Sequence, residues 1–205
     1  DLSNIHVLRN KLNDFKKSGK FVISYAEYYS LGSYYISSVA DQVYLYPEGM
    51  LDYRGLRTEL MFFKGAIEKY GLDVQIIRGS GNDFKSAVEP FMYNKMSVEN
   101  RFQLKSILTT LWNNMNQDIG DSRNITNNNL NQIADSVLAH NSSGSLNQNL
   151  IDATLYEDEL DSIVNSKFSL NENEKMNKIP FKKYIKKQTS KKKFNLSKKS
   201  NIALI

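Results

Sequence analysis

Residues 20–47 read KFVISYAEYYSLGSYYISSVADQVYLYP, and this stretch decides the fold class. Residues 20–26 are a short apolar run, which is typical of a buried strand. A turn-like stretch leads to residues 34–41, which we interpret as a short helix. Residues 42–47 alternate and carry β-branched and aromatic side chains, which predicts a second strand that ends at Pro47. Two strands joined by a helix predict an α/β or layered β-and-α fold.

The alternation of helices and strands continues on both sides of this stretch. Periodic apolar residues predict helices at residues 3–18, 58–70, 97–119, 127–139 and 156–168, and an apolar run predicts another strand at residues 72–79. In the first helix, Ser3 is the expected N-cap and Gly19 the expected end. Its expected apolar face is Ile5, Leu8, Leu12 and Phe15. The expected face of the longest helix is Phe102, Leu104, Ile107, Leu108, Leu111, Trp112 and Met115.

The composition is that of a globular domain and excludes several kinds of site. The chain has 205 residues, enough for one sizeable domain, and no apolar run approaches the roughly 18 residues of a membrane-spanning helix. It has no cysteine, which excludes disulfides, thiolate metal sites and a cysteine nucleophile. His6 and His140 are the two histidines and share no segment, so the sequence predicts no metal site and no cofactor.

The positive charge is concentrated in one segment. Residues 175–200 hold 11 of the 27 basic residues and no acidic ones, so the rest carries 16 basic against 22 acidic residues. A Lys-rich segment with scattered aromatic residues can contact phosphates or lipid head groups, but a solvated linker is the favoured interpretation. We therefore predict a domain over residues 1–168, a Lys-rich linker over residues 169–200, and the start of a second domain at residues 201–205.

Residues 83–91, DFKSAVEPF, contain the first candidate for chemistry, Lys85. A free lysine amine titrates near 10.4, and desolvation in enzymes brings it to about 7–8, where it can activate a serine hydroxyl. The candidate apolar walls of such a site are Phe84, Ala87, Val88 and Phe91. The residues alone leave a second interpretation open, in which Lys85 is a surface lysine at a helix start.

The second candidate for chemistry is a pair of serines. Ser30 and Ser33 flank Gly32 before a helix, as in a nucleophile turn or an anion-binding nest. The chain lacks the G-x-S-x-G pattern here, and serines before helices are usually caps. We therefore favour the interpretation of these serines as helix caps.

The motif DFKSAVEPF resembles the lysine motif of the signal peptide peptidase A family, in the long two-repeat form also called protease IV (peptidase family S49). Residues 18–56 look like the segment that precedes this motif in the family, and residues 96–112 and 149–160 look like the segments that follow it. The similarity covers roughly residues 1–168. A shared order of several motifs is far more specific than any one of them.

The resemblance implies a Clp protease/crotonase-like spiral of ββα units and a serine protease with a Ser–Lys dyad. In the long form the lysine comes from the N-terminal repeat and the serine from the C-terminal repeat, so Lys85 is the implied general base. Leu31 stands where the serine of a catalytic repeat would be, and Ser30 and Ser33 are out of register. The chain is thus similar to most of an N-terminal repeat followed by the inter-repeat linker.

The same resemblance implies partners that lie outside this chain. These are the C-terminal repeat with its serine nucleophile, hydrophobic signal-peptide remnants as substrates, further subunits of a homotetramer, and a membrane anchor N-terminal to the repeats. The implied location is the extracytoplasmic side of a bacterial cell membrane. Because the two dyad residues act as a unit, we expect the chain alone not to hydrolyse peptides.

Three other functions stay open at this point. A crotonase-type acyl-CoA enzyme uses the same superfold, but no paired carboxylates stand out here. In a non-catalytic binding or assembly module, Lys85 would be structural. Nucleic-acid binding would depend on residues 175–200 alone, and the acidic character of the remainder argues against it.

Overall fold

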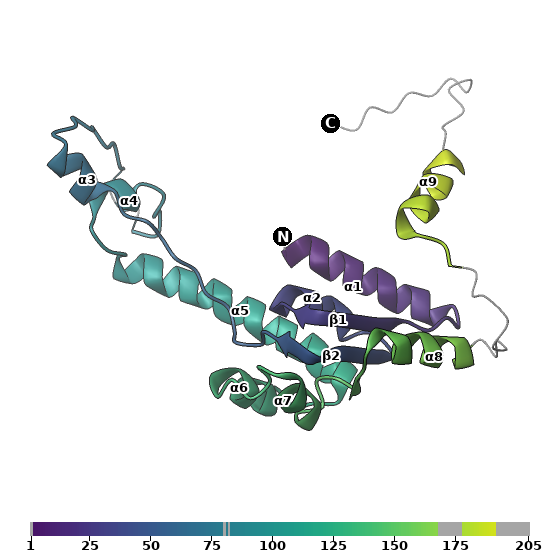
Figure 1. The fold of residues 1–205 in the computed structure, drawn as a ribbon. Helices are drawn as coiled ribbons and strands as arrows, with labels where there is room; N and C mark the ends of the chain where they lie inside the picture. The colour runs from purple at the N-terminus through teal and green to yellow at the C-terminus, as the bar shows by residue number, and fades with distance from the viewer. Residues whose placement is uncertain (1, 80, 82, 168–177, 192–205) are drawn as a thin grey trace, which may run out of the picture. The chain divides into compact units, whose positions relative to one another are not determined.

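The computed structural model describes residues 2–79, 81, 83–167 and 178–191, which fall into two compact units, residues 1–157 and 158–205 (Figure 1). The strands are β1 (Ile23–Tyr29), β2 (Gln42–Leu51) and β3 (Ala153–Thr154). The helices are α1 (Leu2–Lys17), α2 (Leu31–Ser37), α3 (Lys64–Lys69), α4 (Glu89–Met92), α5 (Val98–Arg123), α6 (Asn127–Asp135), α7 (Ser142–Asn147), α8 (Glu157–Lys167) and α9 (Phe181–Lys191).

The three strands form one parallel sheet in the order β1-β2-β3. Helix α2 connects β1 to β2, which confirms the strand–helix–strand prediction and makes the first unit an α/β structure. The first strand was expected to end at residue 26. It continues through residues 27–29, which were expected to belong to a turn. The β3 strand and α7 were not predicted from the sequence.

The β2 strand continues past Pro47, where the sequence predicted its end. Its pairing with β1 shifts at this point: Ala26 pairs with Leu45, and Tyr28 pairs with Met50. Proline has no N–H to donate to a neighbouring strand, so the ladder is interrupted there and resumes after the bulge. Gly49 lies in the bulge, where a Cβ atom would come within 2.6 Å of the Glu27 carbonyl oxygen.

Buried aromatic residues make up much of the core. Tyr34 of α2 is fully buried and packs edge-to-face on Tyr29 and Tyr53, with ring centroids 6.1 Å apart in both pairs. The Tyr34 hydroxyl donates a 2.7 Å hydrogen bond to the Leu150 carbonyl oxygen. These tyrosines therefore belong to the core, where their hydroxyl groups also find partners.

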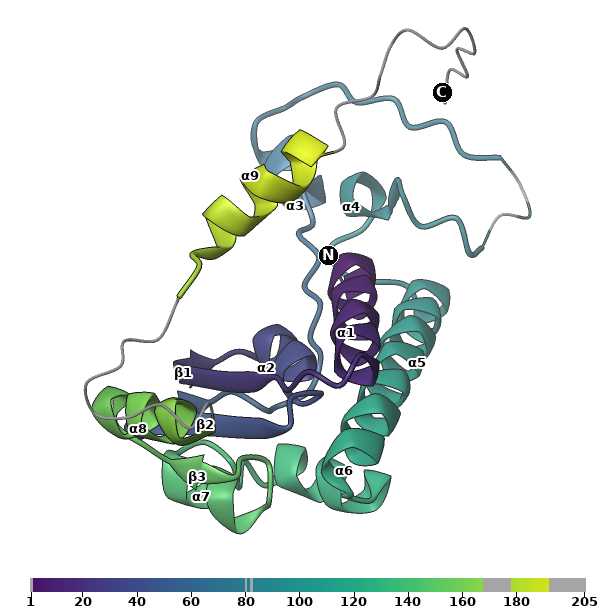
Figure 2. The same cartoon turned by 90° about the vertical axis from the view of Figure 1, so that its right-hand side faces the viewer.

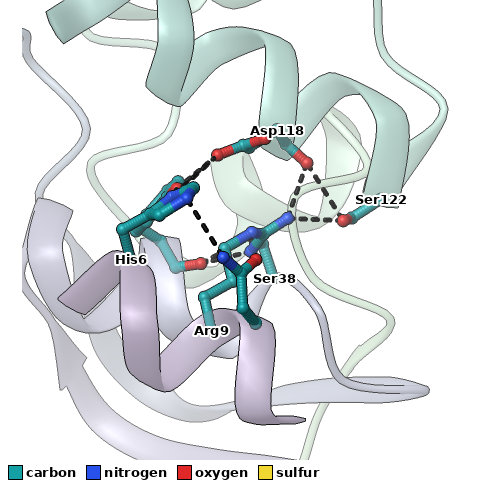
Figure 3. Close-up of polar contacts among 7 residues, drawn as sticks. His6, Arg9, Ser38, Asp118 and Ser122 are labelled. Atoms are coloured by element: carbon teal, nitrogen blue, oxygen red, sulfur yellow. Dashed lines mark hydrogen bonds and ion pairs between the residues drawn. The ribbon is translucent and has the colours of Figure 1, made fainter. Parts of the chain in front are cut away.

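Helix α1 is held in place by a buried arginine (Figure 3). The Arg9 guanidinium donates hydrogen bonds to the Tyr35 carbonyl oxygen and, at 2.7 Å, to the Ser38 hydroxyl, both at the end of α2. It also donates to the Asp118 carbonyl oxygen at 2.6 Å and the Ser122 hydroxyl at 2.5 Å, both on α5. Arg9 thus joins three helices, and Figure 2 shows α1 beside α5.

The expected apolar face of the first helix was therefore partly wrong. Ile5 packs against the core, but Leu8 and Phe15 are exposed, while Arg9 is buried. The guanidinium has five donors in a planar fork, which match the four acceptors that α2 and α5 present. Ser3 lies within α1 rather than before it, and Gly19, with φ of +81°, ends the helix turn as predicted.

Helix α5 confirms the prediction of a long helix after residue 97. Ser97 caps its start by accepting a 3.1 Å hydrogen bond from the Asn100 N–H, and Asn124 in the left-handed conformation follows its end. The expected apolar face is only partly buried, because Met115 lies in the core whereas Phe102 and Ile107 are exposed. The core therefore covers the C-terminal half of α5 and leaves the N-terminal half open.

The segment between β2 and α5 differs most from prediction. The strand expected at residues 72–79 does not form, and the helix expected at residues 58–70 is reduced to α3. We call residues 57–97 the lysine arm, since they contain Lys85. A strand needs a neighbour for its N–H and C=O groups, and the described part of the chain offers none to residues 72–79. Figure 1 shows α3 and α4 of the arm near the N-terminal end of α5.

The second unit contains most of α8 and all of α9. The α8 helix confirms the prediction for residues 156–168, and Lys178 donates a 2.8 Å hydrogen bond to the Asp161 carboxylate. Residues 181–191 form α9 inside the segment that the sequence predicted as a linker, and the linker role itself stays a prediction. The stub expected at residues 201–205 lies outside the described residues. No helix in the described ranges is long and apolar enough to cross a membrane.

Candidate functional site

Lys85 lies in the lysine arm, in the loop before α4, and is exposed. Among the described residues, its side chain has no ion pair or hydrogen bond. Of its candidate walls, Phe84 and Phe91 are 57% and 44% exposed, Ala87 is exposed, and Val88 is half-buried. Within the described chain, therefore, these side chains flank the amine without enclosing it.

A buried carboxylate four residues after Lys85 fixes this loop to α5. Glu89 is fully buried, and its carboxylate accepts hydrogen bonds from the Ser97 hydroxyl at 2.6 Å and the Ser97 N–H at 3.3 Å. It accepts a third from the Asn100 side-chain amide at 2.8 Å. The motif thus carries its own attachment to the start of the long helix, which limits how far the lysine loop can move.

The carboxylate of Glu89 is held in its charged form. Burial is the largest single influence on its pKa and raises it, but the bonds from Ser97 and Asn100, together with the charge of Arg78, outweigh burial. The net result is a pKa below the usual glutamate value. A buried acid is tolerated here because its oxygens have hydrogen-bond donors.

Two further contacts hold the loop to the rest of the arm. The Phe63 N–H donates a 2.7 Å hydrogen bond to the Pro90 carbonyl oxygen, and the rings of Phe63 and Phe91 stack with centroids 5.6 Å apart. On the other side of Lys85, Arg78 donates a 3.2 Å hydrogen bond to the Asp83 carbonyl oxygen. The lysine loop is therefore solvent-exposed but tethered on both sides.

The serine candidates lie on a different element. Ser30 is the N-cap of α2: its hydroxyl accepts a 3.2 Å hydrogen bond from the Ser33 N–H. The Ser33 hydroxyl donates to the Ser30 carbonyl oxygen at 3.0 Å. This confirms the interpretation of Ser30 as a cap, and in the described chain no contact joins either serine to Lys85. Leu31 is half-buried and packs against the core.

The histidines do not form part of a metal cluster in the described residues. His6 lies on α1, where its Nδ1 is 2.9 Å from the Tyr35 hydroxyl, and His140 is exposed after α6. No group of three or more His, Asp or Glu side chains in the described ranges could hold a metal ion.

Glu89 is the site residue that reasoning from the sequence missed. The Glu-Pro pair at the first turn of α4 was visible, and proline at that position is typical of a helix start. The pattern did not show that the Glu89 carboxylate accepts a hydrogen bond from Ser97, which lies eight residues further along the chain. The available signal for this contact was Ser97, a serine placed just before the next helix.

The comparison with known protein families identifies a peptidase family. A model of peptidase family S49 matches residues 14–169 of the chain, a span that contains the sheet, the lysine arm and α5 through α8. The match is therefore to most of the described structure and includes the Lys85 loop.

Three relatives show the same similarity. The chain is 38% identical over 125 residues to Protease 4 of Haemophilus influenzae, a match over 61% of the chain and 20% of that protein. It is 31% identical over 126 residues to Protease 4 of Salmonella typhi, over 62% of the chain and 20% of that protein. It is 26% identical over 191 residues to the chloroplastic serine protease SPPA of Arabidopsis thaliana, over 90% of the chain and 27% of that protein. The chain spans about a fifth of the length of the first two.

Proposed function

Because the chain belongs to peptidase family S49 and is of the protease IV type, we propose that it forms part of a serine protease and supplies the general base of a Ser–Lys dyad. Lys85 is the proposed base. The observation that carries this assignment is the geometry of its loop: an amine with no ion pair in the described chain, tethered through Glu89 to a long helix. A general base needs such a fixed position, and its amine must be neutral before it can accept a proton.

The nucleophile is proposed to come from a part of the protein beyond this chain. Leu31 occupies the position of the serine in a catalytic repeat, and Ser30 is committed to capping α2. A lysine amine becomes a base when burial disfavours its charged form. We therefore propose that a second, serine-bearing repeat packs over the lysine arm and desolvates the amine there. The exposed apolar side chains of the arm support this proposal, since they are surface that such packing would bury.

The proposed substrates are hydrophobic remnants of cleaved signal peptides. The proposed setting is a homotetramer at the extracytoplasmic side of a bacterial membrane, with the anchor outside this chain. The names of the two bacterial relatives support a bacterial protease, and the resemblance of residues 1–168 to signal peptide peptidase A supports the substrate class.

The decisive test compares two lysines of the arm in the complete protein. Lys85→Ala is expected to abolish cleavage of an apolar signal-peptide-like substrate while the far-ultraviolet circular dichroism stays unchanged, because the side chain is exposed. Lys85→Arg is expected to be inactive as well, because a guanidinium stays protonated. Lys95→Ala is the matched control, since Lys95 is also an exposed lysine of the arm. Full activity of the Lys85→Ala protein would refute the assignment.

A second test uses the 205-residue chain by itself. With one dyad residue missing, we expect no turnover of the same peptide, since the residues of such a unit contribute little singly. Turnover by the pure chain that survives in Lys85→Ala but disappears in Ser30→Ala would place the nucleophile on α2 and contradict the proposal.

A further inference from the structure

A groove with a basic end and an apolar floor runs along α5, separate from Lys85. Its volume is about 570 Å³, within the range of ligand sites. One wall is α5 from Arg101 to Trp112, and the other is the non-helical segment of residues 54–58 that leads from β2 into the arm. The end of α6 closes it at Ala134 and Asp135.

The α5 wall of the groove is basic at one end and apolar at the other. Arg101, Lys105, Leu108 and Trp112 follow one another at spacings of three or four residues and therefore share one face of the helix. The first two are exposed cations, and in the described part of the chain neither has an ion pair or a side-chain hydrogen bond. Leu108 and Trp112 are half-buried and continue the face towards the core.

The charges of the opposite wall are already balanced. Arg54 forms an ion pair with Asp52, and it follows Tyr53, whose ring lies 5.3 Å from that of Trp112. Arg54 and Asp135 therefore belong to the end of the groove near the core. The unpaired positive charge lies at the other end, at Arg101 and Lys105, next to the start of the arm.

The segment of residues 54–58 also has backbone groups available for pairing. In the described chain, these residues belong to no strand and make no backbone–backbone hydrogen bonds, so an occupant of the groove can bond to their N–H and C=O groups. The α5 wall from Arg101 to Trp112 is about 16 Å long, which is the length of about five residues of extended peptide. A peptide offers amide partners to this segment, whereas a fatty acid has none.

We propose that this groove binds the apolar C-terminal segment of a peptide, with its free carboxylate at Arg101 and Lys105 and its side chains over Leu56, Leu108 and Trp112. Charge complementarity selects this occupant: the lining carries three cations against one acid, and its two unpaired cations sit at one end of an apolar floor. The proposal rests on the proposed function, because cleavage of a precursor leaves the released peptide with a new C-terminal carboxylate. The groove would thereby favour peptides that have already been cut over intact chains.

The test measures binding to the complete protein in the Lys85→Ala form. The probes are a fluorescein-labelled Leu-Ala-Leu-Ala-Leu peptide with a free carboxylate and the same peptide with a C-terminal amide. We expect the acid to bind about tenfold more tightly than the amide at low salt, with the preference shrinking at high salt. Equal affinities for the two peptides would overturn the proposal.

Paired variants test whether Arg101 and Lys105 bind the carboxylate of the peptide. Arg101→Gln combined with Lys105→Gln is expected to remove the preference for the acid and leave the affinity of the amide unchanged. Lys11→Gln combined with Lys17→Gln removes the same charge from exposed positions of α1 outside the groove and is expected to keep the preference. Loss of the preference in the α1 variant, or its survival in the α5 variant, would place the carboxylate elsewhere.

A competitor separates peptides from other anionic amphipaths. Decanoate has the carboxylate and the apolar chain but no amide groups, so we expect it to displace the labelled acid peptide far less well than the unlabelled peptide does. Equal displacement would overturn the choice of a peptide. Failure of the proposed function appears separately, as cleavage that persists in the Lys85→Ala protein, whereas failure of the groove appears in the comparison of acid with amide.

Discussion

The sheet core and the lysine arm both contain many apolar residues, which are buried in the core and exposed in the arm. In the core, Leu45, Leu51 and Tyr53 are almost completely buried. In the arm, Leu72 is 58% exposed and Ile77 is 87% exposed. The difference lies in the neighbours: β2 has a strand on each side, whereas residues 72–79 have none in the described chain. An apolar strand pattern therefore becomes a strand only where another strand is within reach.

The proposed catalytic base lies in the exposed arm, whereas the serine candidates lie next to the core. The serines of the core region serve structure, as the cap at Ser30 shows, while the exposed arm carries the proposed base. An arm with unburied apolar surface is a natural place for a site completed by another part of the protein.

The same substitution in the two regions should have very different effects on stability. Leu51→Ala removes a fully buried side chain from β2 and is expected to lower the free energy of unfolding of the chain by about 2–5 kcal/mol. Leu72→Ala in the arm is expected to change it by less than about 0.5 kcal/mol. Urea unfolding followed by the fluorescence of Trp112 measures both. Similar losses in the two variants would contradict the contrast.

A matched pair of arginines tests the attachment of α1. Arg9→Lys leaves buried acceptors on α2 and α5 without donors, since an ammonium cannot span them, and is expected to cost about 3 kcal/mol. Arg57→Lys, at a side chain of the arm that is 80% exposed, is expected to cost almost nothing. Both are read in the same unfolding experiment. An Arg9→Lys chain as stable as the Arg57→Lys chain would mean that the network is dispensable.

The Glu89 attachment should show in the pH dependence of the arm. Because its folded pKa lies below the unfolded value of about 4.3, its stabilisation is complete above that value and is lost as the pH falls through the folded pKa. Glu89→Gln is expected to speed amide exchange at Ser97 and Asn100 about tenfold at neutral pH and to remove this acid dependence. Glu68→Gln on α3, an exposed acid, is the control. Unchanged exchange in Glu89→Gln would show that the loop is held by other contacts.

The smallest effect is expected at the serines of α2. Ser30→Ala should cost about 1 kcal/mol of stability through the lost cap. Ser33→Ala should cost less, because its hydroxyl bonds to the carbonyl oxygen and the hydroxyl of Ser30 at an exposed position. Peptide cleavage by the complete protein should persist in both. An inactive but folded Ser30→Ala protein would return this serine to the role of nucleophile.

Much of the fold could be predicted from local patterns in the sequence. The helices α5, α6 and α8 and the β1–α2–β2 unit follow from apolar periodicity and from the alternation in residues 42–47. The errors share one cause. Pro47 did not end β2, Arg9 was buried instead of Leu8, and residues 72–79 did not pair, because each outcome depends on which groups face the segment across space.

The candidate site was readable in part. Lys85 was proposed from the motif in which it lies, and its role stays a prediction; the structure adds that its loop is exposed and tethered. Glu89 and the groove on α5 were not found, because they join residues from different elements. No periodicity within one element reveals such pairs.

The sequence alone was enough to predict the β1–α2–β2 unit and the long helix α5, and it shows the lysine motif and a leucine at position 31. These depend on residue type and on spacing along the chain. Only the tertiary structure decided that Glu89 ties the lysine loop to α5, that Arg9 joins three helices, and that the arm presents its apolar residues to solvent. Burial and hydrogen bonding depend on groups that meet across space, which spacing along the chain does not reveal.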